Sequence, residues 1–254
     1  AGRRLKGERP GSPAPHADPE EMSVSDSRQT ALITGASGGM GAEIARELRR
    51  THRVILVGRN AERLAAVAAD TGGEVWQLDV TDEAALARRV AELDRLDVIV
   101  HAAAIARSLG VEAASPADWD AHFAVNVTAP ATLTRLALPL LRAARGTVVF
   151  IGSGAGTQPA AGSAVYTASK HALRGLADVL RIDEEPHLLR VATVAPGQTD
   201  TEMLRGLIPA DAYRPEHYVQ PSSVARAVRF VVDAPADVQL TDVAVRPRRE
   251  LHRI

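Results

Sequence analysis

The sequence has 254 residues, of which 46% are hydrophobic, and its 31 acidic and 30 basic residues give a net charge of −1. This length and composition suit one α/β domain or two small ones, and the near-neutral charge argues against a nucleic-acid-binding surface. The chain has no cysteine, which excludes disulfides, a thiol nucleophile and thiolate metal sites. The eight histidines are scattered, without an HxxxH or HExxH arrangement, so we expect no metal site. No apolar run is long enough to span a membrane, and we expect a cytoplasmic protein.

Residues 1–28 are rich in proline, glycine, arginine and acids and show no hydrophobic periodicity. We therefore expect a disordered or weakly ordered N-terminal extension. Arg3 and Arg4 could begin a twin-arginine signal, but no apolar segment follows them. Met22 could be the native start, which the sequence alone does not decide.

Thr30–Thr34 predicts a short buried strand, followed at once by the glycine turn GASGGMG and the helical pattern AEIARELRR. Such a unit binds phosphate, because backbone N–H groups and the positive end of the helix dipole face the anion. The spacing is TGxxxGxG rather than GxGxxG, and an ordinary helix-start loop is the alternative. Its place after the first strand favours a dinucleotide site. The predicted contacts in this turn are Gly35, Ser37, Gly39, Met40 and Gly41.

The second predicted strand, Arg53–Val57, ends in Gly58, Arg59 and Asn60. In dinucleotide-binding folds an acidic residue here binds the ribose 2′-hydroxyl, whereas an arginine accommodates a 2′-phosphate. The acid is missing and Arg59 is present. The sequence therefore favours NADP over NAD, although Arg59 could also be an ordinary surface arginine.

Strands and helices alternate along the rest of the chain. Further strands are predicted at Glu74–Leu78, Asp97–Val100, Thr147–Ile151, Arg190–Ala195 and Leu240–Val245, and helices at Ala61–Asp70, Asp82–Leu93, Pro116–Ala143, from Ser163 and at Pro221–Val232. This alternation predicts a parallel sheet with helices on both faces. The irregular segment 202–220 would suit either a substrate lid or a plain connecting loop.

Small and polar residues follow several strands, at the sheet edge where open α/β folds bind ligands. The Asp79 carboxylate could accept a hydrogen bond from an adenine amino group. Alanines after His101 would let a cofactor approach the backbone, although tight strand–helix packing is the alternative. The turn after Ala195 offers hydroxyls to a nicotinamide amide or a phosphate. The predicted contacts in these turns are Asp79, Val80, Ala102, Ala103, Pro196, Gly197, Thr199 and Thr201.

The segment Gly146–Lys170 carries the strongest chemical signal. Tyr166 and Lys170 are four residues apart, so they share one face of the predicted helix. A tyrosine has a reference pKa of about 10, and a nearby cation favours the phenolate, so we expect Lys170 to lower the pKa of Tyr166. Lys6 and Lys170 are the only lysines in the chain. A partly buried tyrosine beside a lysine that extends to solvent is the alternative.

Asn126 lies four residues before Pro130 in the predicted helix Pro116–Ala143. Because proline has no N–H, Pro130 cannot donate to the Asn126 carbonyl, which is then free to hold a water molecule. A proline kink can also be purely structural.

Together these motifs resemble the short-chain dehydrogenase/reductase family, in its ordinary single-domain subgroup. Tyr166–Lys170 matches the family's YxASK motif, TGASGGMG its cofactor turn, and Pro196-Gly197 its late turn. Asn126 matches its helix asparagine, and Ser153 lies at the position of its catalytic serine. The resemblance covers about Gln29–Pro247. It implies a doubly wound Rossmann-type parallel sheet of about seven strands, with residues 29–254 forming a single dinucleotide-binding catalytic domain.

The resemblance also implies an oxidoreductase that transfers a hydride between NADP(H) and a small carbonyl or alcohol substrate, as a homodimer or homotetramer. Tyr166 would act as general acid/base, and Ser153 would hydrogen-bond the substrate oxygen. Lys170 would bind the nicotinamide ribose, and a water on the Asn126 carbonyl would link it to solvent. The implied catalytic residues are Asn126, Ser153, Tyr166 and Lys170, of which Tyr166 and Lys170 also contact the cofactor.

Two stretches depart from the family pattern. His101-Ala102-Ala103-Ala104 replaces NNAG, and Gly152–Gly156 replaces SSxAG, which bears on cofactor affinity more than on activity. Two other functions stay open. One is a non-catalytic NADP-binding sensor or scaffold, against which the four intact catalytic residues argue. The other is a lyase or epimerase, for which TGxxGxxG spacing would be expected.

Overall fold

Seven parallel strands form one sheet in the order β3-β2-β1-β4-β5-β6-β7. The computed structural model describes residues 2 and 28–249, so the predicted N-terminal extension lies almost wholly outside the described residues. The strands are β1 (Gln29–Thr34), β2 (His52–Gly58), β3 (Glu74–Gln77), β4 (Val98–His101), β5 (Thr147–Ile151), β6 (Arg190–Pro196) and β7 (Asp242–Val245). Strand addition reverses direction between β1 and β4, which is where doubly wound folds bind their ligands.

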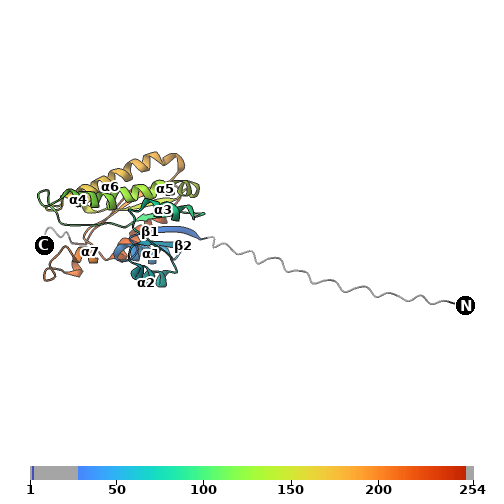
Figure 1. Ribbon diagram of the computed structural model, residues 1–254, viewed down its shortest axis with the longest axis horizontal. Helices are drawn as coiled ribbons and strands as arrows, with labels where there is room; N and C mark the ends of the chain where they lie inside the picture. Colours follow the sequence, from blue (N-terminus) through green and yellow to red (C-terminus); the bar gives the residue numbers. More distant parts are fainter. Residues whose placement is uncertain (1, 3–27, 250–254) are drawn as a thin grey trace.

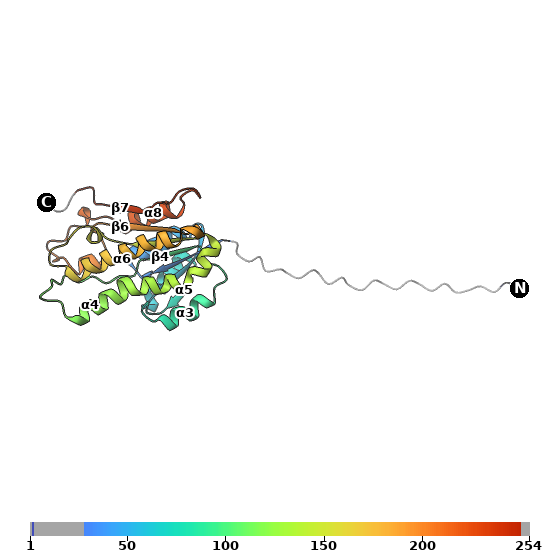
Figure 2. The ribbon, with the colours of Figure 1, turned by 90° about the horizontal axis from the view of Figure 1, so that it is seen from above.

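Helices cover both faces of the sheet (Figure 1). One layer contains α1 (Gly39–Leu48), α2 (Ala61–Thr71) and α8 (Pro221–Val232). The other contains α3 (Glu83–Ala91), α4 (Pro116–Phe123), α5 (Ala129–Ala144) and α6 (Ala164–Asp183), seen from above in Figure 2. A short helix, α7 (Glu202–Arg205), follows β6. The predicted fold class is confirmed.

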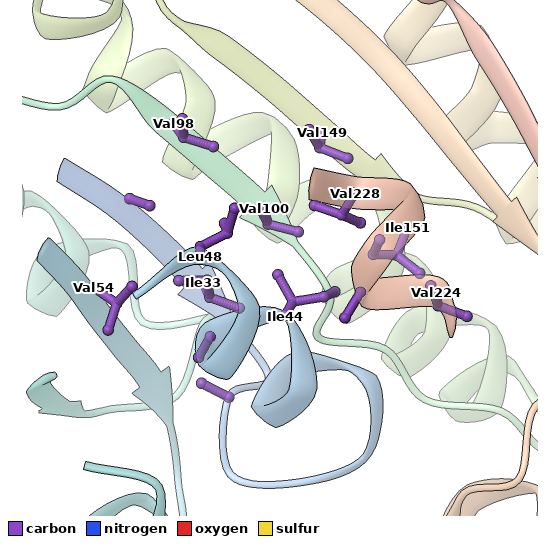
Figure 3. Packing of buried hydrophobic residues seen from close by; sticks show 14 of the residues in the cluster. Ile33, Ile44, Leu48, Val54, Val98, Val100, Val149, Ile151, Val224 and Val228 are labelled. Atoms are coloured by element: carbon purple, nitrogen blue, oxygen red, sulfur yellow. The ribbon is translucent and has the colours of Figure 1, made fainter. Parts of the chain in front are cut away.

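Alternating strand residues fill the two cores. In β1, Ile33 packs toward α1 and α8, whereas Leu32 packs in the core beneath α3, α5 and α6. In β5, Val149 and Ile151 belong to the first core (Figure 3). Phe150, between them, belongs to the second. Because both faces are covered, these strands are continuously apolar in sequence.

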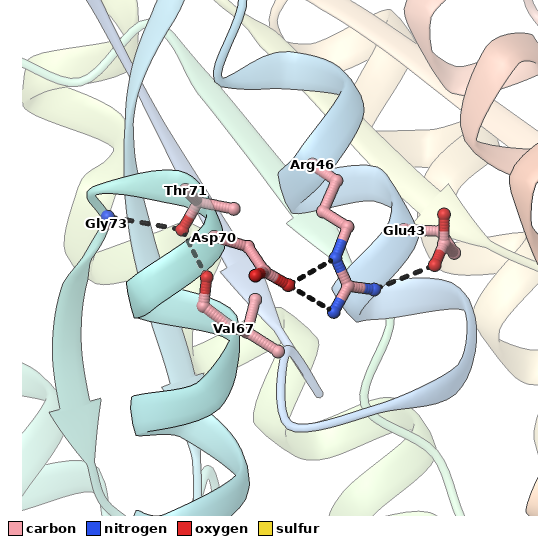
Figure 4. Close-up of polar contacts among 6 residues, drawn as sticks. All are labelled: Glu43, Arg46, Val67, Asp70, Thr71 and Gly73. Carbon is pink, nitrogen blue, oxygen red and sulfur yellow. Dashed lines mark hydrogen bonds and ion pairs between the residues drawn. The ribbon is translucent and has the colours of Figure 1, made fainter.

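Polar contacts join α1 to the end of α2 (Figure 4). The Arg46 guanidinium donates to the Asp70 carboxylate over 2.9 and 3.0 Å and to Glu43 over 2.7 Å. The Thr71 hydroxyl donates to the Val67 carbonyl and accepts from the Gly73 N–H. Since the ion pairs are partly exposed, they orient the two helices more than they stabilise them.

The structure corrects the prediction of one continuous helix over 116–143. A π-helical turn, η1 (Ala124–Thr128), separates α4 from α5, and the Ala129 N–H donates to the carbonyl of Ala124, five residues back. Pro130 lacks the N–H that would complete the regular ladder, so the wider turn forms there. Two smaller predictions were also wrong: the last strand begins at Asp242 rather than Leu240, and helix α7 lies in the segment predicted to be irregular.

Candidate active site

A cleft of about 390 Å³ opens at the carboxyl ends of β1, β2 and β4, at the reversal of strand order. It brings together most of the predicted cofactor contacts. Those lining it are Gly35, Ser37, Gly39, Met40, Gly41, Arg59, Asp79, Val80, Ala102, Ala103 and Thr201.

The glycine turn is built by close backbone packing. A Cβ atom on Gly41 would lie 2.3 Å from the carbonyl oxygen of Gly35, and one on Gly35 would lie 2.8 Å from the backbone nitrogen of Ala103. Gly35 also has a φ of +68°, which favours glycine. The Thr34 hydroxyl holds the other side of the turn, because it accepts from the N–H groups of Ala102 and Ala103. This turn, with the N-terminus of α1, fits a dinucleotide pyrophosphate.

Arg59 and Asp79 form the end of the cleft beyond β2. The Arg59 side chain is 75% exposed, and its guanidinium lies 3.6 Å from the Asp79 carboxylate. Asp79 accepts from the N–H and hydroxyl of Thr81, and the backbone bond is the main cause that lowers the pKa of Asp79. The carboxylate is therefore ionised at neutral pH, while Arg59 keeps donors free for an anionic ligand.

Arg63 is a cleft residue that the sequence analysis missed. It lies in the first turn of α2, where its N–H donates to the capping Asn60 side chain over 2.9 Å. Its guanidinium lines the cleft and pairs with Glu202 at 2.6 Å. The available signal was a second arginine four residues after Arg59, which directly follows β2.

Ser153 and Tyr166 lie beyond β5, and the Ser153 hydroxyl is close enough to the Tyr166 phenol to act on its pKa. Ser153 follows the strand by two residues, and its hydroxyl accepts from the Ala155 N–H over 3.1 Å. Tyr166 lies in the first turn of α6. The structure therefore brings the phenol and the serine hydroxyl together at the carboxyl end of β5.

Lys170 is 3% exposed and lies one turn further along α6. Its Nζ donates to the Ile151 carbonyl over 2.9 Å and lies 5.8 Å from the centre of the Tyr166 ring. Burial lowers the pKa of Lys170 to about 8. Burial also raises the pKa of Tyr166, against the smaller opposing effect of the Ser153 hydroxyl. The expected lowering of the tyrosine pKa is therefore wrong for this structure, because burial disfavours the charged phenolate.

Asn126, which is 1% exposed, joins three parts of the site. Its side chain makes a pair of hydrogen bonds with the backbone of Ile105, of 2.9 and 3.0 Å, and donates to the Ser169 hydroxyl over 3.0 Å. Ser169 in turn donates to the Tyr166 carbonyl. The loop after β4 is thereby tied to the helix that carries the tyrosine. The role of the Asn126 carbonyl in holding water stays a prediction.

Several predicted cofactor contacts lie outside the cleft lining. Gly197 packs against the Pro247 side chain, and the buried Thr199 hydroxyl donates to the Gly197 carbonyl over 3.0 Å. Ser153 and Lys170 line a separate cavity of about 130 Å³. The predicted contacts that do not line the cleft are Tyr166, Lys170, Pro196, Gly197 and Thr199.

His101 explains one departure from the family pattern. Its Nε2 lies 2.8 Å from the Thr134 hydroxyl, and its ring stacks on Phe150 with centroids 4.9 Å apart. Burial lowers the pKa of His101 to about 3, so the ring is neutral at ordinary pH. The histidine therefore links β4 to α5 as a structural residue.

Residues 2 and 28–249 contain neither a metal-binding cluster of acidic, histidine or cysteine residues nor a membrane-spanning helix. No cluster of three or more His, Cys, Asp or Glu residues in these ranges could hold a metal ion. Within the same part of the chain, every helix is too short or too polar to cross a membrane.

The sheet, the glycine turn at its strand reversal and the adjoining Ser153–Tyr166 pair define a Rossmann-type dinucleotide-binding protein. A sequence model of the short chain dehydrogenase family matches residues 29–211. The chain belongs to this family, as the motifs predicted.

Curated relatives cover most of the chain. NADP-dependent 3-hydroxy acid dehydrogenase YdfG of Salmonella typhi is 34% identical over 234 residues, which are 85% of this chain and 94% of that protein. The uncharacterized oxidoreductase SERP2049 of Staphylococcus epidermidis is 27% identical, over 86% of this chain and 97% of the relative.

Solved structures agree with these relatives. The closed form of serine dehydrogenase complexed with NADP+ matches with a TM-score of 0.79 and 30% identity, over 85% of this chain and 94% of that one. A putative short-chain dehydrogenase/reductase from Corynebacterium glutamicum matches with a TM-score of 0.68 and 42% identity, over 87% of this chain and all of the other. A metagenomic short-chain oxidoreductase in complex with NADP gives a TM-score of 0.73 and 33% identity, over 87% and 98% of the two chains.

Proposed function

We propose that this protein transfers a hydride between NADP(H) and a small carbonyl or alcohol substrate, with Tyr166 as general acid/base. The observation that carries the proposal is the placement of Ser153 and Tyr166 beyond the end of β5, with the buried Lys170 one helical turn from the tyrosine and its Nζ 5.8 Å from the centre of the tyrosine ring. An idle tyrosine would not need a serine hydroxyl there together with a buried lysine one turn away.

NADP is the cofactor. The exposed Arg59 beyond β2 offers a cation where a 2′-phosphate binds, and solved relatives contain NADP. When bound, NADP(H) supplies or accepts the hydride. The chain's contribution is to hold the dinucleotide on the glycine turn and to place a proton donor beside the substrate oxygen.

The raised pKa of Tyr166 keeps the phenol protonated at neutral pH. A protonated phenol suits carbonyl reduction, because Tyr166 can donate to the oxygen as negative charge develops on it. Ser153 donates a hydrogen bond to the same oxygen. The Lys170 ammonium, one turn away, stabilises the phenolate that remains after the transfer.

The names of relatives suggest where to look for the substrate. YdfG is named a 3-hydroxy acid dehydrogenase, and a solved neighbour is a serine dehydrogenase. We therefore place 3-hydroxy acids and their oxidised forms first in a panel of ketones, aldehydes and alcohols. Turnover is followed by the nicotinamide absorbance with both NADP and NAD.

The decisive variant is Tyr166→Phe, which removes only the hydroxyl. We expect NADPH oxidation to fall by about 100-fold or more, while NADPH binding measured by calorimetry changes little. Wild-type turnover by this variant would contradict the catalytic role. Tight NADPH binding by the natural chain with no turnover on the whole panel would favour the alternative, a sensor or scaffold.

We further propose a cytoplasmic homodimer or homotetramer in which residues 29–254 form one catalytic domain. Val179 and Ile182 on α6 and Phe230 on α8 are large apolar side chains exposed to solvent. Burying them between subunits would remove that apolar area from water. Sedimentation equilibrium tests the assembly, and a monomer at all concentrations would contradict it.

A further inference from the structure

Arg63 and Glu202 form an ion pair that crosses the cofactor cleft. Arg63 belongs to the first turn of α2, and Glu202 is the first residue of α7, 139 positions later. The guanidinium nitrogen lies 2.6 Å from the carboxylate oxygen, and both residues line the cleft. The pair therefore connects the segment after β6 to the helix after β2.

Helix α7 brings its carboxylate close to the phosphate-binding turn. A Cβ atom on Gly39 would lie 3.4 Å from the Cγ2 of Thr201, so the start of α7 packs directly on the glycine turn. Thr201 caps this helix by accepting from the Leu204 N–H. Glu202 follows, and its negative charge would repel a bound dinucleotide unless a cation offset it. Arg63 supplies that cation.

Arg63 also shares the cleft with Arg59. The two residues lie on either side of Asn60, the residue that caps α2, at the carboxyl end of β2. A 2′-phosphate binds at this end of the strand in dinucleotide folds. The side chains of Arg63 and Glu202 are 53% and 75% exposed, and an ion pair this exposed is weak. Arg63 can therefore exchange its partner at little cost.

We propose that Arg63, together with Arg59, selects NADP over NAD, and that Glu202 competes with the cofactor's 2′-phosphate for Arg63. This inference rests on the NADP dependence proposed above. A phosphate near neutral pH offers more charge and more acceptor oxygens than a carboxylate, so it displaces Glu202. NAD(H) lacks the group and leaves the ion pair intact. Glu202 thereby weakens the preference that Arg63 creates.

The test compares two probes that differ only in the 2′-phosphate, namely 2′,5′-ADP and 5′-ADP. Their affinities for the full chain are measured by calorimetry without substrate, and the ratio of the two affinities defines the 2′-phosphate preference. We expect Arg63→Gln to weaken the binding of 2′,5′-ADP about 10-fold or more and the binding of 5′-ADP less than about 2-fold. Glu202→Gln should raise the preference about 2- to 5-fold.

The double variant separates competition from a general charge effect. If Glu202 acts through Arg63, Glu202→Gln no longer changes the preference once Arg63 is glutamine. Matched controls are Glu62→Gln, beside Arg63 but outside the cleft lining, and Arg88→Gln on the exposed face of α3. Both controls should keep the natural preference.

Three outcomes would contradict the proposal. If Arg63→Gln weakened the binding of both probes equally, the ion pair would only connect the two sides of the cleft and would not recognise the 2′-phosphate. An unchanged preference in Glu202→Gln would exclude the competition. A natural chain that prefers 5′-ADP would contradict the NADP dependence itself. Because no substrate is needed, absence of oxidoreductase turnover would not affect any of these measurements.

Discussion

The Lys170 ammonium lies 2.9 Å from the backbone carbonyl oxygen of Ile151, in a buried position beside the end of β5. A neutral carbonyl compensates an ammonium less than a carboxylate does, so burial is the dominant influence on its charge. The pKa of Lys170 is accordingly lowered to about 8. Its protonation state therefore changes just above neutral pH.

The lowered pKa of Lys170 predicts the pH above which activity is lost. Because the folded-state pKa is about 8, Lys170 is charged below that pH and loses its proton as the pH rises through it. We expect kcat/KM for NADPH, which reports groups of the free enzyme, to fall up to about tenfold per pH unit above this point. Any activity that remains in Lys170→Arg should not show this fall at alkaline pH, since a guanidinium stays charged. A kcat/KM that began to fall only above about pH 10, near the ordinary lysine pKa, would contradict the prediction.

Arg59→Ala is predicted to change cofactor preference. The Arg59 side chain is 75% exposed and its guanidinium lies 3.6 Å from the Asp79 carboxylate, so its removal should leave the fold intact. We expect NADPH binding to weaken about 10-fold or more, because a charge-assisted hydrogen bond to the phosphate is lost, while NADH binding changes little. Fluorescence titrations of both cofactors measure this. Equal losses for the two cofactors would remove the 2′-phosphate role of Arg59.

The fold could be predicted because its signals are local. Apolar strands such as Thr147–Ile151 alternate with amphipathic helices, and the glycine spacing between Gly35 and Gly41 marks the phosphate-binding turn. Tyr166 and Lys170 are four residues apart, so helix geometry alone places them on one face. These features need no knowledge of distant contacts.

What the sequence could not predict depends on distance and burial. Glu202 and Arg63 are 139 residues apart, and only the folded chain shows their contact. The pKa of Tyr166 rises because desolvation disfavours the charged phenolate, and the spacing from Lys170 does not reveal that desolvation. The π-helical turn at Asn126 could not be predicted, because the sequence does not show how the hydrogen bonds of the helix rearrange around Pro130, which has no N–H.

We expect two glycines of the turn, Gly41 and Gly38, to differ in whether they tolerate substitution by alanine. A Cβ atom at Gly41 would lie 2.3 Å from the Gly35 carbonyl oxygen, whereas nothing lies within 4 Å of one at Gly38. Gly38 also has an extended backbone, with a φ of 173°, that alanine can adopt. We expect Gly41→Ala to weaken NADPH binding about 100-fold or to destabilise the fold by about 2 kcal/mol or more. Gly38→Ala should keep the natural stability, and because Gly38 lines the cleft its NADPH binding should weaken less than that of Gly41→Ala. Binding titrations and denaturant unfolding of the two variants measure the difference, and equal behaviour would contradict the close packing of the turn.

His101 predicts how stability depends on acid. Its folded-state pKa of about 3 lies below the ordinary value of 6.5, so between these two values the unfolded chain binds a proton that the folded chain does not. The stability contributed by the neutral ring is therefore complete above about pH 6.5 and is lost as the pH falls, at up to about 1.4 kcal/mol per pH unit from this group.

Urea unfolding of the natural chain and of His101→Gln between pH 7 and pH 4 tests this behaviour. Glutamine does not titrate, so we expect the free energy of unfolding of the variant to fall less steeply as the pH is lowered. The difference in slope should approach about 1.4 kcal/mol per pH unit, the value for one proton. The variant also loses the contacts with Thr134 and Phe150, which lowers its stability at every pH without changing the slope. His52, whose pKa burial also lowers, contributes equally to both proteins and cancels in the comparison. Identical slopes would mean that the His101 ring is protonated in the folded protein, contrary to its buried position against Phe150.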